Sequence, residues 1–192
     1  MAGLLGVGPN GVSIGRPAAA SVSMLMTLDE LVGFADEVVI ATPLDRTSRW
    51  ETLPSGKRIV TYTRLSIDET LLGTQKSEIT VRTLGGSVDN LGQVVSGEAR
   101  LIKDERALMF LSEIDDGAGG TVTIVTGMAQ GHFPIDDTGQ EPKLKASPDR
   151  GALLPRRGPS ISAAELLVGE TLHTARTRID ESAARNGKKR TK

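Results

Sequence analysis

The histidine and acidic side chains have the types and spacing that could do chemistry. The segment HFPIDD places Asp136 and Asp137 shortly after His132. An imidazole with two carboxylates can hold a divalent cation or act in acid–base hydrolysis. The same residues are also typical of an ordinary surface loop, because metal sites usually carry a second histidine or a recognised spacing. Under the first of these two interpretations, His132, Asp136 and Asp137 are the candidate metal-binding residues. The sequence predicts no other catalytic residue and no cofactor.

A glycine-rich stretch, TLGGSVDNLGQVVSGEARL at 83–101, could bind phosphate. Gly92 and Gly97 have the glycine spacing of a P-loop, but Glu98 follows where a lysine is required, and its carboxylate would repel phosphate. The pattern favours a structural role, in which glycines supply the positive φ that turns and bulges need. We expect Gly85 and Gly86 to end a strand. We also expect the next apolar residues to fill one end of the fold, namely Val88, Leu91, Val94 and Val95.

Composition excludes several other kinds of chemistry. There is no cysteine, which removes disulfides, thiol nucleophiles and cysteine-based metal sites. The Gly-x-Ser-x-Gly pattern of a hydrolase nucleophile is absent, and carboxylate pairs such as Asp115 and Asp116 are adjacent, so in a strand they would point to opposite faces. The sequence thus favours a binding function over an enzymatic one.

Charge and hydropathy narrow the class of partner. Residues 27–149 contain 12 Lys+Arg against 20 Asp+Glu, a net charge of −8, whereas five basic residues lie in the last eight. An acidic body is a poor surface for nucleic acid, because phosphate contacts need clustered basic residues. We interpret the basic tail as solubilising. No segment reaches the ~20 apolar residues of a membrane span. The expected partner is a protein, with no nucleic acid and no membrane span.

The elements that must position these residues are mostly strands. Thr27 and Glu30 have capping-box spacing, which predicts a short helix ending near Asp36. The clearest β signal lies at 57–71, where apolar residues and threonines alternate with polar residues. Ser162 and Glu165 repeat the capping-box pattern and predict a C-terminal helix. Further strands are predicted at 37–42, which Pro43 bends or ends, and at 78–84, 106–114 and 121–127, with a short strand within 128–140.

This order predicts a mainly β fold, a small closed antiparallel OB-like barrel of five to six strands with an N-terminal and a C-terminal helix. A long connection between the third and fourth strands is typical of such barrels, and the glycine-rich stretch lies there. We expect a disordered or degenerate signal-like segment at 1–26, the barrel domain at 27–149, a linker at 150–160, the C-terminal helix at 161–185 and a basic disordered tail at 186–192.

The chain resembles a family of uncharacterised bacterial proteins, many from myxobacteria and their relatives. The resemblance covers about 27–133, through segments such as LDELVGFADEVVIATP and LGQVVSGEARLIKDERALMFL. The matching positions are Ala35, Asp36, Val38, Val39, Gly73, Thr83, Gly85, Gly86, Gly92, Val95, Gly97, Phe110 and Leu111. Members are typically exported, so the resemblance implies an extracytoplasmic setting. A cytoplasmic one is the alternative, because the N-terminus lacks a basic region and a long apolar region.

More remotely, the order of elements is similar to that of netrin-like and tissue-inhibitor-of-metalloproteinase domains, which are OB barrels. Inhibitors of that group rely on an N-terminal cysteine and disulfides, and this chain has neither. The resemblance therefore implies the barrel and not the inhibitory site. The leading hypothesis is a non-enzymatic binding or protein-interaction module. The alternative is a metal-dependent or hydrolytic enzyme that uses the neighbourhood of His132, Asp136 and Asp137.

Overall fold

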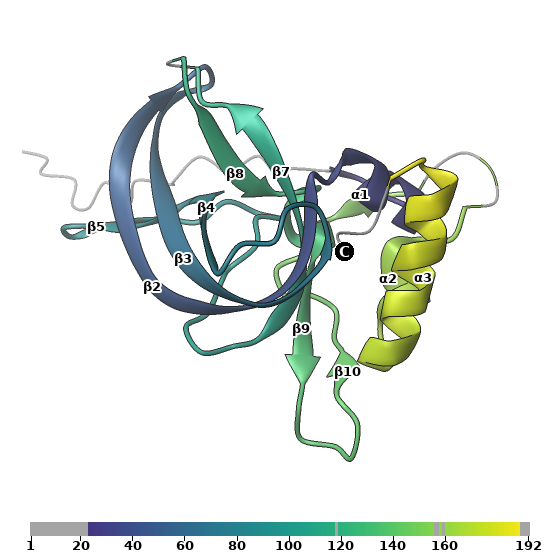
Figure 1. Ribbon diagram of the computed structural model, residues 1–192. Helices are drawn as coiled ribbons and strands as arrows, with labels where there is room; N and C mark the ends of the chain where they lie inside the picture. The colour runs from purple at the N-terminus through teal and green to yellow at the C-terminus, as the bar shows by residue number, and fades with distance from the viewer. Residues whose placement is uncertain (1–22, 118, 156–157, 159, 189–192) are drawn as a thin grey trace, which may run out of the picture.

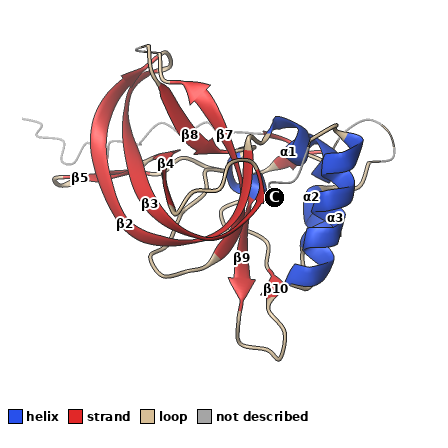
Figure 2. Cartoon of the chain, in the orientation of Figure 1, coloured by secondary structure: helices blue, strands red, loops and turns tan. Residues whose placement is uncertain are grey.

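The computed structural model describes residues 23–117, 119–155, 158 and 160–188, and it is mainly β (Figure 2). One sheet has seven strands: β2 (Glu37–Leu53), β3 (Gly56–Leu72), β4 (Glu78–Leu84), β7 (Ala107–Asp115), β8 (Thr121–Val125), β9 (His132–Asp136) and β10 (Lys143–Leu144). Two small two-stranded sheets are formed by β5 (Gly86–Val88) with β6 (Leu91–Gln93), and by β1 (Ser23–Met24) with β11 (Leu153–Leu154). The helices are α1 (Leu28–Phe34), the 3-10 helix η1 (Met128–Gly131), α2 (Ala163–Leu167) and α3 (Leu172–Arg185).

The large sheet curls into a partly closed ring. Its strand order is β10-β9-β7-β2-β3-β4-β8, and β8 pairs with β7 as well as with β4. All pairings in the ring are antiparallel except that of β4 with β8, which is parallel and is held by one register pair, Val81 with Thr123. The expected antiparallel arrangement holds for every other pair of the ring, and the exception has a simple reason. Five strands in a ring cannot all alternate in direction, so one neighbouring pair must be parallel.

The strands β2 and β3 are unusually long and pair along nearly their whole length (Figure 1). Their register shifts at three places, the last between Pro43 and Asp45. Such bulges bend a strand and increase its twist, so one strand can pass around two sides of the ring. The strand continues through Pro43, as the sequence allowed. The Pro43 carbonyl accepts a hydrogen bond of 2.9 Å from the Asp104 amide, which fixes the connection between β6 and β7 beside the bend.

Two cores lie on opposite faces of the sheet. Inside the ring, β7 contributes Ala107, Met109 and Leu111, which pack with residues such as Val39 and Leu65. The other face of β7 carries its remaining apolar residues toward the helices, which gather on one side of the ring (Figure 1). Because both faces of the first half of β7 are covered, residues 107–111 are continuously apolar rather than alternating. The strands contribute buried side chains at Ile59, Leu65, Val81, Leu108 and Phe110, and partly buried ones at Ile67, Ile79 and Ile124.

Both predicted helix starts are confirmed. Thr27 and Ser162 each form a complete capping box with the glutamate three residues later. The C-terminal helix, expected as one element, is divided into α2 and α3. Gly169 lies between them at φ +84°, and its amide donates a hydrogen bond to the carbonyl of Leu144 on β10. The chain therefore turns between α2 and α3 and remains in contact with the sheet. Among the described residues, no helix is long and apolar enough to cross a membrane.

The edges of the predicted domain are tied to its body. The side chain of Gln130 accepts a hydrogen bond from the Met26 amide and donates one to the Met24 carbonyl. Ser23 and Met24 pair with Leu153 and Leu154, within the segment predicted as a linker. The expectations for 1–22 and 189–192 lie outside the described residues.

Candidate binding site

His132, the first candidate metal-binding residue, is buried on β9 opposite Met109 and is 2% exposed. Its Nδ1 lies 3.3 Å from the hydroxyl of Ser147. Burial lowers the pKa of His132 to about 4, because an imidazolium would lose its hydration there. The ring is therefore neutral at pH 7 and has a hydroxyl as its partner.

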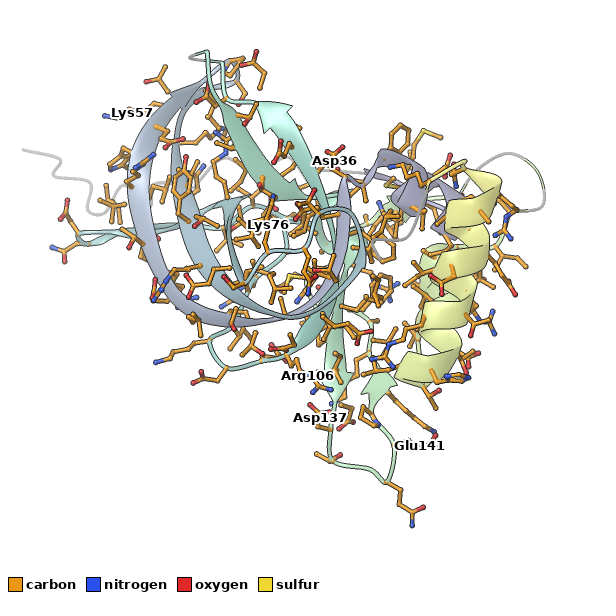
Figure 3. The ribbon with its side chains drawn as sticks, viewed as in Figure 1. Asp36, Lys57, Lys76, Arg106, Asp137 and Glu141 are labelled. Atoms are coloured by element: carbon orange, nitrogen blue, oxygen red, sulfur yellow. The ribbon has the colours of Figure 1, made fainter. Side chains whose placement is uncertain are left out.

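Asp136 and Asp137 have partners of their own. Asp136 accepts hydrogen bonds from Thr138 and forms a 3.0 Å salt bridge with Lys145, and these contacts lower its pKa to about 2. Asp137 pairs with Arg106 at 3.1 Å, beside the loop that joins β9 to β10 (Figure 3). Within the described part of the chain, no three His, Cys, Asp or Glu side chains gather as a metal-ion site would require. The structure does not bring the three candidates together around one cation.

The glycine stretch begins as expected. The strand β4 ends at Leu84, and Gly85 and Gly86 follow with φ values of +92° and +130°. A Cβ atom on Gly86 would lie within 2.5 Å of both Thr61 Oγ1 and Ser48 Oγ. Glycine at this position is therefore needed both for the backbone conformation and for the close approach of β5 to the β2–β3 hairpin.

The residues that fill the ring differ from those expected. Val88 is only half-buried, and β5 and β6 form a hairpin that projects from the ring (Figure 1), leaving Val94 89% exposed. Ala99 and Leu101 enter the inner core instead. The chain can turn back because Gly97 has φ +81° and its carbonyl accepts a hydrogen bond from the Ala129 amide. The two residues between the short strands, Asp89 and Asn90, are turn-forming types, and Asp89 has φ +53°.

Glu98, the residue that breaks the P-loop pattern, is a buried acid. Its burial raises the pKa to about 7, because desolvation outweighs the backbone hydrogen bonds from Leu84 and Ala99 and the charge of Arg82. A single glutamate in a glycine-rich segment gave no signal of burial. The burial of Glu98 could have been inferred from its neighbours Ala99 and Leu101, because these two apolar residues bring the backbone on either side of Arg100 into the core.

A pocket of about 430 Å³ lies between the bend of β2 and the connection that leads to β7. Its volume is within the range of small-molecule sites. The two sides meet because of the Asp104–Pro43 hydrogen bond. We call it the bend pocket, and it is lined by Pro43, Leu44, Asp45, Arg46, Thr63, Leu101, Ile102 and Lys103.

Thr63 is a buried polar residue in the wall of the bend pocket. It is 2% exposed, and its Oγ1 has no hydrogen-bond partner in the described structure. A buried hydroxyl without a partner costs about 1–3 kcal/mol, so such groups are rare in folded proteins. Thr63 lies directly opposite Arg46 on β2, so the two side chains are on the same face of the sheet, and the Thr63 hydroxyl lies just beneath the pocket surface.

The charges around the bend pocket are unequal. Arg46 and Lys103 are cationic, and neither forms a salt bridge with a described residue. Asp45 is the one acid in the wall, and it forms a 2.5 Å salt bridge with Arg64. The pKa of Asp45 is lowered chiefly by the hydrogen bond from Arg64 and also by the charge of Lys103. The pocket therefore has a net positive lining within an acidic body.

Comparison with known proteins adds no relative. A scan of protein-family models and searches of curated proteins and solved structures found no match to this chain.

Proposed function

We propose that this protein is a non-enzymatic binding or protein-interaction module whose binding site is the bend pocket. The observation that carries the proposal is the hydroxyl of Thr63, buried in the pocket wall without a partner. A ligand group that pairs with this oxygen removes an energetic cost that the free protein bears. The apolar side chains around it supply the burial that drives association.

The architecture that we propose for the module is an OB-like barrel. The five strands β2, β3, β4, β7 and β8 form the ring, and the long connection lies between its third and fourth strands. OB-type barrels have this number of strands and commonly bind ligands through their surface and loops. The proposed setting is extracytoplasmic, which rests on the resemblance of 27–133 to exported proteins.

The pocket is suited to binding rather than to bond cleavage. Its wall contains no histidine, and its one carboxylate, Asp45, already accepts hydrogen bonds from Arg64. A general base must be free to accept a proton from the reacting group. Among the described residues, no base accepts a hydrogen bond from Thr63, so none can activate its hydroxyl as a nucleophile. The described wall can recognise a ligand through contact, charge and one hydroxyl.

A solution NMR screen tests this proposal. We expect small apolar fragments, whatever their charge, to shift the resonances of Thr63, Leu101 and Ile102 in the full chain. Ile102→Trp fills the pocket from its half-exposed side and should abolish these shifts, whereas Val94→Trp, on the exposed hairpin, should leave them unchanged. Fragments that bind elsewhere, or no binding at millimolar concentration, would contradict the proposal.

A further inference from the structure

We infer that the bend pocket takes a short apolar group that ends in a carboxylate, either a free aliphatic acid or the C-terminal residue of a peptide. This inference rests on the proposed function and adds the chemical class of the ligand. It depends on the charges of the wall, on the unpartnered hydroxyl and on the size and polarity of the space between them.

The charge of the wall matches a monoanion. Arg46 and Lys103 contribute two positive charges and Asp45 one negative charge, so the lining has a net charge of +1. The Asp45 carboxylate already forms a salt bridge with Arg64. Arg64 also forms a salt bridge of 3.2 Å with Glu78. Residues 27–149 carry a net charge of −8, so a positive site in this body is a local exception. Coulomb attraction therefore favours an anion over a neutral or cationic ligand of the same shape.

The hydroxyl of Thr63 completes the recognition of a carboxylate. A threonine hydroxyl can donate one hydrogen bond, and a carboxylate has two oxygens that accept. Thr63 and Arg46 are directly opposite on adjacent strands, where side chains lie close enough to contact the same group. One carboxylate oxygen can accept from Arg46, and the other can accept from Thr63 once rotation about χ1 turns its covered hydroxyl toward the pocket; hydrogen bonds to a charged group are the stronger kind.

The remaining wall fixes the apolar part of the ligand. Pro43, Leu44, Leu101 and Ile102 present hydrocarbon to the space, and Leu101 also belongs to the inner core, so this surface is held in place. A volume of about 430 Å³ lies near the lower end of ligand sites. The space is large enough for a branched aliphatic group together with its carboxylate.

Matched probes separate charge from shape. The full chain is titrated by NMR with 4-methylpentanoate and with N-acetyl-L-leucine, and then with 4-methylpentanamide, N-acetyl-L-leucinamide and 4-methylpentylamine. We expect each acid to bind the pocket about ten-fold more tightly than its amide, and the amine to bind most weakly. The preference should shrink at about 0.5 M NaCl, where charges at a surface are screened.

Variants locate the origin of the preference. Arg46→Gln and Lys103→Gln should each weaken acid binding about five-fold and leave amide binding unchanged. Lys57→Gln is the control, because Lys57 lies over Trp50 near the tip of the β2–β3 hairpin and away from the pocket. N-acetyl-L-leucine binding more tightly than the free acid identifies a peptide C-terminus, and the reverse identifies a small acid. Either result supports the inference.

The failures are distinguishable. If the amides or the amine bind the pocket as tightly as the acids, the inference is overturned while the proposed function stands. If no probe binds the pocket, both are overturned. If the acids bind with the expected preference but Arg46→Gln and Lys103→Gln do not reduce it, the anion is held elsewhere and the inference is wrong.

Discussion

Thr63 on β3 and Arg46 on β2 are direct cross-strand neighbours, and both line the bend pocket. Their placement follows from the bulge between Pro43 and Asp45, which sets the register of the second half of β2. One more or one fewer residue at this bulge would turn every later side chain of β2 to the other face. The bulge thus determines which polar groups the pocket contains.

Removing the hydroxyl of Thr63 should separate stability from binding. Thr63→Val keeps the shape and the β preference of the side chain but removes the unpartnered oxygen, so we expect the free energy of unfolding to rise by about 1 kcal/mol or more. Acid binding should weaken in the same variant. Urea denaturation measures the first effect and NMR titration the second. A clear loss of stability would show that the hydroxyl already has a stabilising partner.

Phe110 should be a principal contributor to the core between the sheet and the helices. It is fully buried and contacts Phe133 edge to face. Truncation of a buried aromatic leaves a cavity, so Phe110→Ala should cost about 3–5 kcal/mol in chemical denaturation. Phe34→Ala is the matched control, because Phe34 is 66% exposed and should cost less than about 1 kcal/mol. Similar losses in both variants would contradict the strand assignment.

Glu98 should make the fold less stable as pH rises. Its pKa is raised from 4.5 to about 7 in the folded protein, so between these values the folded state binds more protons than the unfolded state. Its stabilising effect is fully present below pH 4.5 and is lost as pH rises through 7, by up to about 3 kcal/mol. Glu98→Gln should remove this dependence, as measured by urea denaturation from pH 4 to 8. An unchanged profile in that variant would place the charged carboxylate in water.

His132 should have the opposite effect over nearly the same range. Its pKa is lowered from 6.5 to about 4, so the unfolded state binds more protons and stability rises with pH between these values. The two groups should largely cancel in the wild type between pH 4.5 and 6.5. His132→Asn should therefore expose the fall due to Glu98, and Glu98→Gln the rise due to His132. A steep slope in the wild type, unaltered in either variant, would contradict this balance.

Three glycines of the connection should differ in tolerance. Gly86→Ala should be the most costly change, because the added Cβ would collide with Thr61 and Ser48. Gly97→Val should cost about 1–3 kcal/mol through strain at positive φ, since only ordinary contacts surround its Cβ. Gly92→Ala meets one distant atom and should be nearly neutral. Thermal unfolding ranks the three, and an equal effect at Gly92 would exclude backbone geometry as the cause.

Local patterns predicted the parts of the fold that depend on neighbours in the chain. Alternation at 57–71 gave β3, and the capping boxes at Thr27 and Ser162 gave the helix starts. The split of the C-terminal helix was missed because it depends on a contact between Gly169 and Leu144. The filling of the ring by Leu101 rather than Val94 was missed because two short strands and a tight turn direct the earlier apolar residues away.

The candidate site was missed for a related reason. Its wall comes from three separate segments of the chain, at 43–46, 63 and 101–103. None of these segments contains a recognised binding motif. Alternation placed Thr63 on the inward face, but only the register with β2 brings it opposite Arg46. The prediction for His132, Asp136 and Asp137 depends on their closeness in sequence. Because β9 is extended, residues that are close in its sequence lie well apart in space. His132 is in the interior, and Asp137 is in the loop after the strand.

Intermolecular nuclear Overhauser effects between 4-methylpentanoate and the full chain would show directly whether the bend pocket holds the ligand. We expect contacts from the methyl groups of the acid to the side chains of Leu101 and Ile102, and their loss in Ile102→Trp. Contacts to Leu91 and Val94 on the projecting hairpin, or none at saturating acid, would contradict the claim that the bend pocket is the binding site of this protein.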